Sequence, residues 1–104
     1  MDNDRNQKGT EKWYTFLVVD DDKNLNQTVC TYLNDCGFEA KGVLSANEAY
    51  DEMYNNLYEL IISDIMMPEI DGFEFAETVR QVNKQIPILF MSLRMIFLPN
   101  GKDF

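Results

Sequence analysis

Residues 16–22 read FLVVDDD, a short apolar run that stops abruptly at three aspartates. Together with Thr15, the run has the length and the β-branched content of a buried strand, which we predict over residues 15–19. A strand that is apolar throughout is typical of a parallel sheet with both faces covered. The aspartates therefore follow the carboxyl end of the first predicted strand.

A helix is predicted next, because apolar residues recur at helical spacing and Gly37 follows as a stop. These residues are Leu25, Val29, Tyr32, Leu33 and Cys36. A weaker strand is predicted over residues 38–43. Ser45 and Glu48 then form the S-x-x-E pattern of a capping box, which predicts the start of a second helix. Its apolar stripe consists of Ala49, Tyr50, Met53 and Leu57.

The second half of the chain repeats this alternation. A third strand is predicted over residues 60–62, again followed by an acid, Asp64. Residues 65–72 are predicted to be a loop, because they contain Pro68 and an Asp-Gly pair. The third helix is marked by Phe75, Ala76, Val79 and Val82. Residues 87–91 form a fourth apolar run, and the alternation predicts an α/β fold with an open parallel sheet.

Polar residues stand at the carboxyl ends of three predicted strands: Asp20 and Asp21, Asp64, and Ser92. Binding sites of open parallel sheets lie at these ends, so neighbouring strands bring the four side chains together. Three crowded carboxylates repel one another, and a hard cation such as Mg²⁺ relieves that repulsion. One carboxylate can then act as a nucleophile toward phosphorus, and the Ser92 hydroxyl can donate a hydrogen bond to the phosphoryl group.

Composition limits the other classes of function. The chain has 104 residues and a net charge of −9, which predicts one domain and no direct nucleic-acid binding by this segment. It contains no histidine, which excludes Ser-His-Asp triads and His-ligated zinc sites. No apolar run approaches the ~20 residues of a membrane span. The polar N-terminus lacks the apolar core of a signal peptide, so we expect a cytoplasmic protein.

The two cysteines, Cys30 and Cys36, fall in the first predicted helix. Six residues of helix separate their backbones by ~9 Å, beyond the ~7 Å that a disulfide can bridge. We therefore predict two free thiols, buried or half-buried, as suits a reducing compartment.

Three segments together resemble the receiver domain of two-component response regulators: FLVVDDD, SDIMMPEIDG over residues 63–72, and PILFMS over residues 87–92. Order and spacing match from Phe16 to Ser92. The resemblance implies a flavodoxin-like open parallel sheet in strand order 2-1-3-4, flanked by three helices. It also implies a signalling role rather than an enzymatic one, in which a sensor histidine kinase donates a phosphoryl group to Asp64.

The resemblance further implies a Mg²⁺ site. Its ligands are Asp21, Asp64 and the backbone carbonyl of Met66, with Asp20 acting largely through metal-bound water. Ser92 matches the family's Ser/Thr, which reorients on phosphorylation. Pro68 and Gly72 match the residues that shape the loop beside the acceptor.

The chain departs from the family after the fourth strand. Family members have five strands and five helices, and a lysine on the fifth strand that stabilises the phosphoryl oxygens. The fifth strand and the last helices have no counterpart here, and Lys102 lies in a different context, NGKDF. The expected organisation is a disordered arm over residues 1–12, an incomplete receiver domain over residues 13–92 and an atypical tail over residues 93–104. Without the lysine, we expect phosphorylation of Asp64 to be slow or undetectable.

A one-base deletion would explain the tail. The codons TCA-CTA-AGG-ATG-ATT-TTC encode Ser92 to Phe97, and one G inserted after TCA changes the product to Ser-Ala-Lys-Asp-Asp-Phe. The restored text is similar to the start of a receiver's fourth helix. An unshifted frame in the coding DNA would refute this hypothesis.

Two other functions are compatible with parts of the sequence. The first is a phosphorylation-impaired receiver that acts only as an interaction unit. The second is a haloacid-dehalogenase-like phosphatase with Asp20 as nucleophile and Asp22 as its partner, although that reading leaves the residue 64–72 motif unexplained. The apolar tail residues 95–98 could fold back over the sheet face that lacks a helix or pair with another chain. We favour pairing, as a homodimer through the fourth strand and the tail, because exposed apolar edges invite it.

Overall fold

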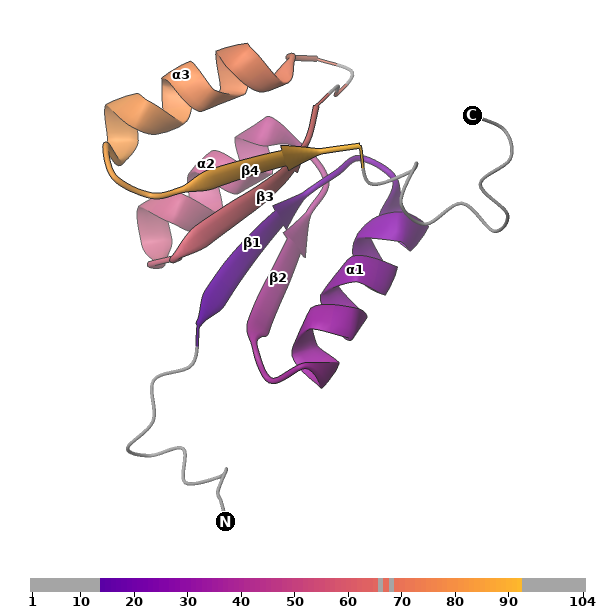
Figure 1. Cartoon of the computed structure of the whole chain (residues 1–104). Helices are drawn as coiled ribbons and strands as arrows, with labels where there is room; N and C mark the ends of the chain where they lie inside the picture. The colour runs from indigo at the N-terminus through magenta and orange to yellow at the C-terminus, as the bar shows by residue number, and fades with distance from the viewer. Residues whose placement is uncertain (1–13, 66, 68, 93–104) are drawn as a thin grey trace.

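A computed structural model describes residues 14–65, 67 and 69–92, and its elements alternate as predicted (Figure 1). The strands are β1 (Thr15–Val19), β2 (Glu39–Val43), β3 (Leu60–Asp64) and β4 (Ile88–Met91). The helices are α1 (Lys23–Asp35), α2 (Ala46–Asn55) and α3 (Gly72–Val82). Within the described ranges, no helix combines the length and the apolarity that a membrane crossing requires.

The four strands form one parallel sheet in the order β2-β1-β3-β4, which confirms the predicted topology. Val19 of β1 pairs with Val43 of β2 on one side and with Ser63 of β3 on the other. Asp64 pairs with Met91 of β4. This register brings the carboxyl ends of all four strands to one edge of the sheet.

Helices cover the sheet on both faces (Figure 1). On one face, Ala49 of α2 and Phe75 of α3 pack with Leu17 and Ile61 in the larger apolar cluster. On the other face, Val29 of α1 packs against a smaller cluster from β1 and β3. Successive residues of a strand point to opposite faces, so the apolar run of β1 supplies both clusters. The chain is thus a three-layer α/β structure.

Each helix begins at a side chain that accepts a hydrogen bond from the backbone. Asp22 accepts from Leu25 N at 3.1 Å, Ser45 from Glu48 N at 3.1 Å and Asp71 from Glu74 N at 2.9 Å. Such caps satisfy backbone N–H groups that have no partner inside the helix. The capping box at Ser45 is confirmed, and its Glu48 carboxylate accepts from Leu44 N.

Two details of the sequence interpretation were wrong. Leu57 does not belong to the apolar stripe of α2, because the helix ends at Asn55 and Leu57 is 89% exposed. Cys36 is exposed rather than buried or half-buried, and it is the C-cap residue of α1. Cys30 is half-buried, and both cysteines are free, as predicted.

The predicted arm 1–12, the tail 93–104 and the residues Met66 and Pro68 lie outside the described residues.

Candidate functional site

Three aspartates come together at the carboxyl edge of the sheet. Asp20 and Asp21 follow β1, and Asp64 is the last residue of β3. One carboxylate oxygen from each lies within 4.8 Å of the other two. Asp20 is fully buried and Asp64 is 7% exposed, whereas Asp21 is partly exposed. The strand-end reasoning therefore predicted this cluster correctly.

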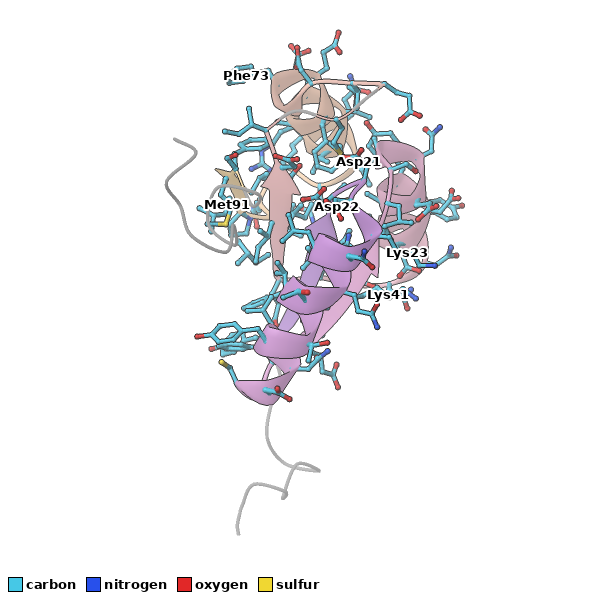
Figure 2. The ribbon with its side chains drawn as sticks, turned by 90° about the vertical axis from the view of Figure 1, so that its right-hand side faces the viewer. Asp21, Asp22, Lys23, Lys41, Phe73 and Met91 are labelled. Carbon is cyan, nitrogen blue, oxygen red and sulfur yellow. The ribbon has the colours of Figure 1, made fainter. Side chains whose placement is uncertain are left out.

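The sheet register explains why these acids meet. Val19 pairs with Ser63, so the residues that follow them, Asp20 and Asp64, leave adjacent strands at the same level. The chain then turns into α1, and Figure 2 shows Asp21 and Asp22 together at the start of that helix. Parallel strands thus supply the acids from segments more than forty residues apart in the sequence.

The turn after β1 is held by hydrogen bonds to aspartate side chains. The Asp20 carboxylate accepts from Asp22 N at 2.9 Å, and the Asp22 carboxylate in turn caps α1. Asp22 therefore has a structural role, as the N-cap of α1. Asp20 is oriented toward the cluster by the loop's own backbone.

The fourth predicted residue, Ser92, stands at the same edge. It follows Met91, the register partner of Asp64, and it is half-buried. Ser92 therefore directly follows β4, the strand that pairs with β3 and its Asp64. Met66, whose carbonyl the sequence resemblance assigned to the metal, lies outside the described residues.

The loop after Asp64 is closed by Gly72. Gly72 N donates to Ile65 O at 2.8 Å, which joins the two ends of the loop. A Cβ at Gly72 would lie 3.0 Å from that carbonyl and 3.0 Å from the ring of Phe90, so a larger residue would push these neighbours apart by a few tenths of an ångström. Met67 anchors the middle of the loop in the larger apolar cluster.

The donor set fits a small divalent cation. Carboxylate oxygens are the hard ligands that Mg²⁺ prefers, at about 2.1 Å, so ligands on opposite sides of the ion are about 4.2 Å apart. The carboxylate oxygens here are within 4.8 Å of one another. Small side-chain rotations, or one coordinated water, suffice to match them to an octahedral ion.

Sequence reasoning missed Asn26, the fourth residue of α1. It is 3% exposed, and its side-chain amide donates to three backbone carbonyls around the turn that carries Asp20. The helical pattern treats Asn26 as an ordinary polar position. A glycine in the middle of a predicted strand, Gly42, was the available signal, because such a glycine often marks a close backbone approach.

Comparison with known proteins now identifies the family. The model of the response regulator receiver domain matches residues 16–95, and the chain belongs to this family. Response regulator Rre1 of Synechocystis sp. is 35% identical over 83 residues, which cover 77% of this chain and 36% of that protein. Transcriptional regulatory protein RprY of Bacteroides fragilis is 34% identical over 80 residues, covering 77% of this chain and 34% of that protein. The chain thus spans about a third of the length of these relatives.

Solved structures give the same result. Chemotaxis protein CheY4 of Vibrio cholerae superposes with a TM-score of 0.73 at 34% identity, covering 76% of this chain and 68% of that one. Response regulator protein TrrA, in a structure of histidine kinase ThkA in complex with it, has a TM-score of 0.69 at 32% identity. That match covers 74% of this chain and 66% of the other. The predicted receiver family and its fold are both confirmed.

Proposed function

We propose that this receiver domain accepts a phosphoryl group on Asp64 from a phosphohistidine of a sensor histidine kinase, in a reaction that requires Mg²⁺. The observation that carries this proposal is the approach of Asp20, Asp21 and Asp64 to within 4.8 Å at the carboxyl edge of the sheet. The similarity to TrrA, which was solved in complex with a histidine kinase, supports the choice of partner.

The chemistry is a single displacement at phosphorus. An oxygen of the Asp64 carboxylate attacks the phosphorus, a P–O bond forms, and the P–N bond to the donor imidazole breaks. The imidazole nitrogen leaves with the electron pair and is then protonated. Asp21, Asp64 and the Met66 carbonyl would hold Mg²⁺ directly and Asp20 through water, and the ion supplies charge neutralisation for the phosphoryl oxygens. The Ser92 hydroxyl would donate a hydrogen bond to the attached phosphoryl group.

The role is regulatory and involves no turnover of an external substrate. It belongs in the cytoplasm, where sensor kinases present their phosphohistidine. With a net charge of −9, this segment makes no direct contact with nucleic acid, because the phosphate backbone repels it. In this proposal, the kinase is the domain's macromolecular partner.

A phosphatase that uses Asp20 and Asp22 receives no support from the geometry. Such a mechanism needs the second acid to face the substrate. The Asp22 carboxylate instead accepts a hydrogen bond from Leu25 N as the cap of α1. The acid that joins Asp20 at the cluster is Asp64, from a different strand.

Two measurements test the proposal. Calorimetric titration with Mg²⁺ is expected to show one site, weakened at least about 10-fold in Asp64→Asn, because a coordinating carboxylate is lost. Incubation with acetyl phosphate and Mg²⁺ is expected to label the chain on Asp64 only slowly, at the low rate expected without the family's lysine, and to leave Asp64→Asn unlabelled. Asp71→Asn is the matched control: Asn caps a helix as well as Asp does, so binding and labelling should not change.

The outcomes separate the alternatives. Mg²⁺ binding without any labelling would contradict phosphoacceptance and leave the interaction unit as the function. Labelling that persists in Asp64→Asn would refute the choice of acceptor. Mg²⁺ affinity that does not change in Asp64→Asn would refute the metal site.

A further inference from the structure

The side chain of Asn26 connects α1 to the ends of two strands. Its amide nitrogen donates to Val43 O at 2.8 Å, to Asp20 O at 3.0 Å and to Val18 O at 3.3 Å. All three partners are acceptors, which fixes the orientation of the amide group. With 3% of its surface exposed, Asn26 makes these contacts away from competing solvent.

These contacts lie where the sheet's own hydrogen bonding ends. Asp20 N donates to Val43 O at 3.2 Å, after the last register pair of β1 and β2. Beyond that point the chain turns toward α1. The Asp20 carbonyl then accepts a hydrogen bond from the Asn26 side chain instead of from a neighbouring strand. That carbonyl belongs to the peptide unit between Asp20 and Asp21. Its orientation therefore determines the direction in which both acidic side chains leave the backbone.

Strand β2 is adapted to admit this amide. A Cβ on Gly42 would lie 1.9 Å from Asn26 Oδ1 and 3.1 Å from Cys30 Sγ. A larger residue at position 42 therefore requires the Asn26 amide to move. The Cys30 thiol donates to Asn26 Oδ1 at 3.5 Å, so the remaining end of the amide is also held.

We propose that Asn26 is a positioning residue for the carboxylate cluster, acting on Asp20 and Asp21 through the peptide unit between them, with Gly42 as the residue that makes room for it. This role rests on the Mg²⁺ site proposed above. A positioning role differs from a purely stabilising one in its consequence. Loss of Asn26 is expected to lower Mg²⁺ affinity even in protein that is fully folded.

The decisive comparison is between two asparagines of the same helix. Asn34 also binds backbone of β2, accepting from Ala40 N at 2.9 Å, but at the opposite end of the strand from Val43. Asn26→Ala is expected to weaken Mg²⁺ binding about 10-fold to 100-fold, the range for outer-shell partners of metal ligands. Asn34→Ala is expected to bind Mg²⁺ as the parent chain does. Calorimetry measures both, with circular dichroism as the test of folding.

Gly42→Ala provides a second route to the same effect. It retains Asn26 but displaces the amide, so it is expected to lower Mg²⁺ affinity in the same direction. Once Asn26 is Ala, the clash with its amide is gone and only the 3.1 Å approach to Cys30 Sγ remains, so the double variant is expected to show little further loss. Neighbouring residues that act through one contact show this kind of non-additivity.

Amide hydrogen exchange gives a readout that needs no metal. Asp22 N donates to the Asp20 carboxylate, so its protection reports on the turn itself. We expect Asn26→Ala to speed exchange at Asp22 and not at Ala40, and Asn34→Ala to do the reverse. If the parent chain binds no Mg²⁺, the proposed metal site fails, and the exchange pattern still decides the role of Asn26.

An osmolyte distinguishes two causes of weak Mg²⁺ binding in Asn26→Ala: partial unfolding of the chain, and displacement of the Asp20 and Asp21 carboxylates in folded protein. Sucrose favours the compact state and would return a partly unfolded Asn26→Ala chain to the folded form. Mg²⁺ affinity that stays low in the refolded variant upholds the positioning role. Affinity that returns fully to the parent value, or unchanged exchange at Asp22, overturns it.

Discussion

Single residues at the carboxyl edge have little freedom to vary. Gly72 packs between the Ile65 carbonyl and the ring of Phe90, at distances that a methyl group would make tighter than ordinary van der Waals contact. Gly37, after α1, has a φ of 102°, a conformation that favours glycine for a different reason. Substitution of Gly72 therefore tests a steric effect at the site, and substitution of Gly37 tests a backbone effect far from the site.

Gly72→Ala is expected to destabilise the domain by about 1–3 kcal/mol, the usual range for overpacking, and to displace the loop after Asp64. Weaker Mg²⁺ binding should accompany the loss of stability. Gly37→Ala is the control, because it should cost roughly 1 kcal/mol through its positive φ without changing Mg²⁺ affinity. Urea unfolding and calorimetry measure the two quantities. Equal Mg²⁺ affinities in the two variants would contradict the role assigned to Gly72.

Ser92 provides a test at the acceptor side of the site. Ser92→Ala removes a hydroxyl from the strand next to Asp64 but removes no carboxylate. We expect Mg²⁺ affinity within twofold of the parent value and a lower rate of labelling by acetyl phosphate, because one donor to the phosphoryl group is lost. Ser92→Thr retains the hydroxyl and should restore the rate. An unchanged rate in Ser92→Ala would exclude the proposed hydrogen bond.

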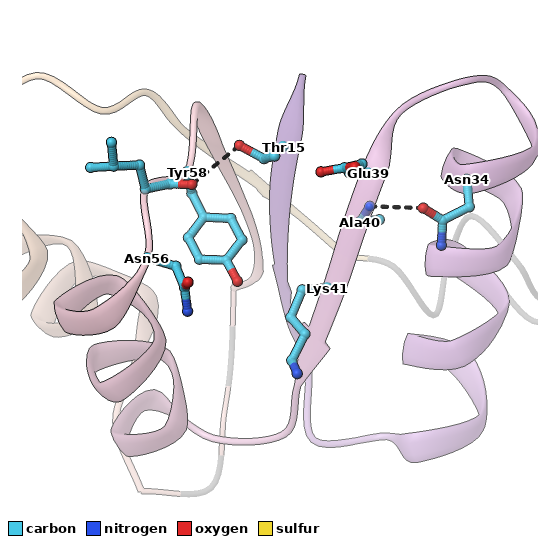
Figure 3. Close-up of a pocket in the computed structure, with 8 residues that line it drawn as sticks. Thr15, Asn34, Glu39, Ala40, Lys41, Asn56 and Tyr58 are labelled. Carbon is cyan, nitrogen blue, oxygen red and sulfur yellow. Dashed lines mark hydrogen bonds between the residues drawn. The ribbon is translucent and has the colours of Figure 1, made fainter. Parts of the chain in front are cut away.

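At the scale of elements, the connection between α2 and β3 is held by a polar cluster at the other edge of the sheet. The Tyr58 hydroxyl donates to the Glu52 carboxylate at 2.6 Å, and Lys41 Nζ lies 3.7 Å from the other oxygen. Figure 3 shows Tyr58 and Lys41 in a cavity of about 430 Å³, which Thr15 also lines. The Tyr58 hydrogen bond, followed by the charge of Lys41, lowers the pKa of Glu52. Burial, followed by the same hydrogen bond, raises the pKa of Tyr58.

Tyr58→Phe is expected to lower the free energy of unfolding at pH 7 by about 1 kcal/mol, the net value of one hydrogen bond. Because the pKa of Glu52 is lowered on folding, this contribution is complete above its ordinary value of 4.5 and is lost as the pH falls below it. Because the pKa of Tyr58 is raised, the contribution is also lost as the pH rises above 10.0.

Urea unfolding across this pH range measures the difference between the parent chain and Tyr58→Phe. Tyr54→Phe is the control, because Tyr54 is 87% exposed and its hydroxyl contributes nothing comparable. A difference in stability that is constant from pH 3 to pH 7 would rule out the contribution of the Glu52 hydrogen bond.

The elements could be predicted because their signals are local. Apolar runs identified the strands and helical spacing identified the helices, while parallel topology placed Asp20 and Asp64 at one edge. Asn26 was missed because Gly42 indicates only that some group approaches β2 closely, and the helical pattern does not distinguish Asn26 from Asn24, which is the same residue type on the same helix and is exposed. Which asparagine is buried depends on the rotation of α1 against the sheet. That rotation follows from packing with β2, and single-sequence patterns do not encode it.

At the scale of the whole molecule, the two faces of the sheet are covered unequally. Two helices, α2 and α3, lie on one face, and α1 lies on the other beside β1 and β2 (Figure 1). Leu89 of β4 pairs with Ile62, which belongs to the α1-side apolar cluster, and Leu89 is 46% exposed. Within the described residues, β4 pairs only with β3 and is one of the two outer strands of the sheet, the other being β2. An apolar outer strand of this kind is prone to pair with a second chain.

We therefore predict that the 104-residue chain self-associates through β4, with residues 94–104 contributing. Sedimentation is expected to show a dimer or a larger species, and Leu89→Lys is expected to shift it toward monomer by placing a charge on the contact. Leu57→Lys is the matched control. Leu57 is more exposed than Leu89, but it lies before the amino end of β3 and not on β4. Deletion of residues 94–104 should also change the assembly.

Salt provides an independent check of this association. Each copy carries a net charge of −9, so two copies repel over the ~10 Å screening length of 0.1 M salt. Because ~1 M salt shortens that length to about 3 Å, an apolar contact through Leu89 should become tighter as salt is added. An association held by surface ion pairs would weaken instead. A strict monomer at high protein concentration and high salt, with Leu89→Lys sedimenting identically, would refute the predicted contact.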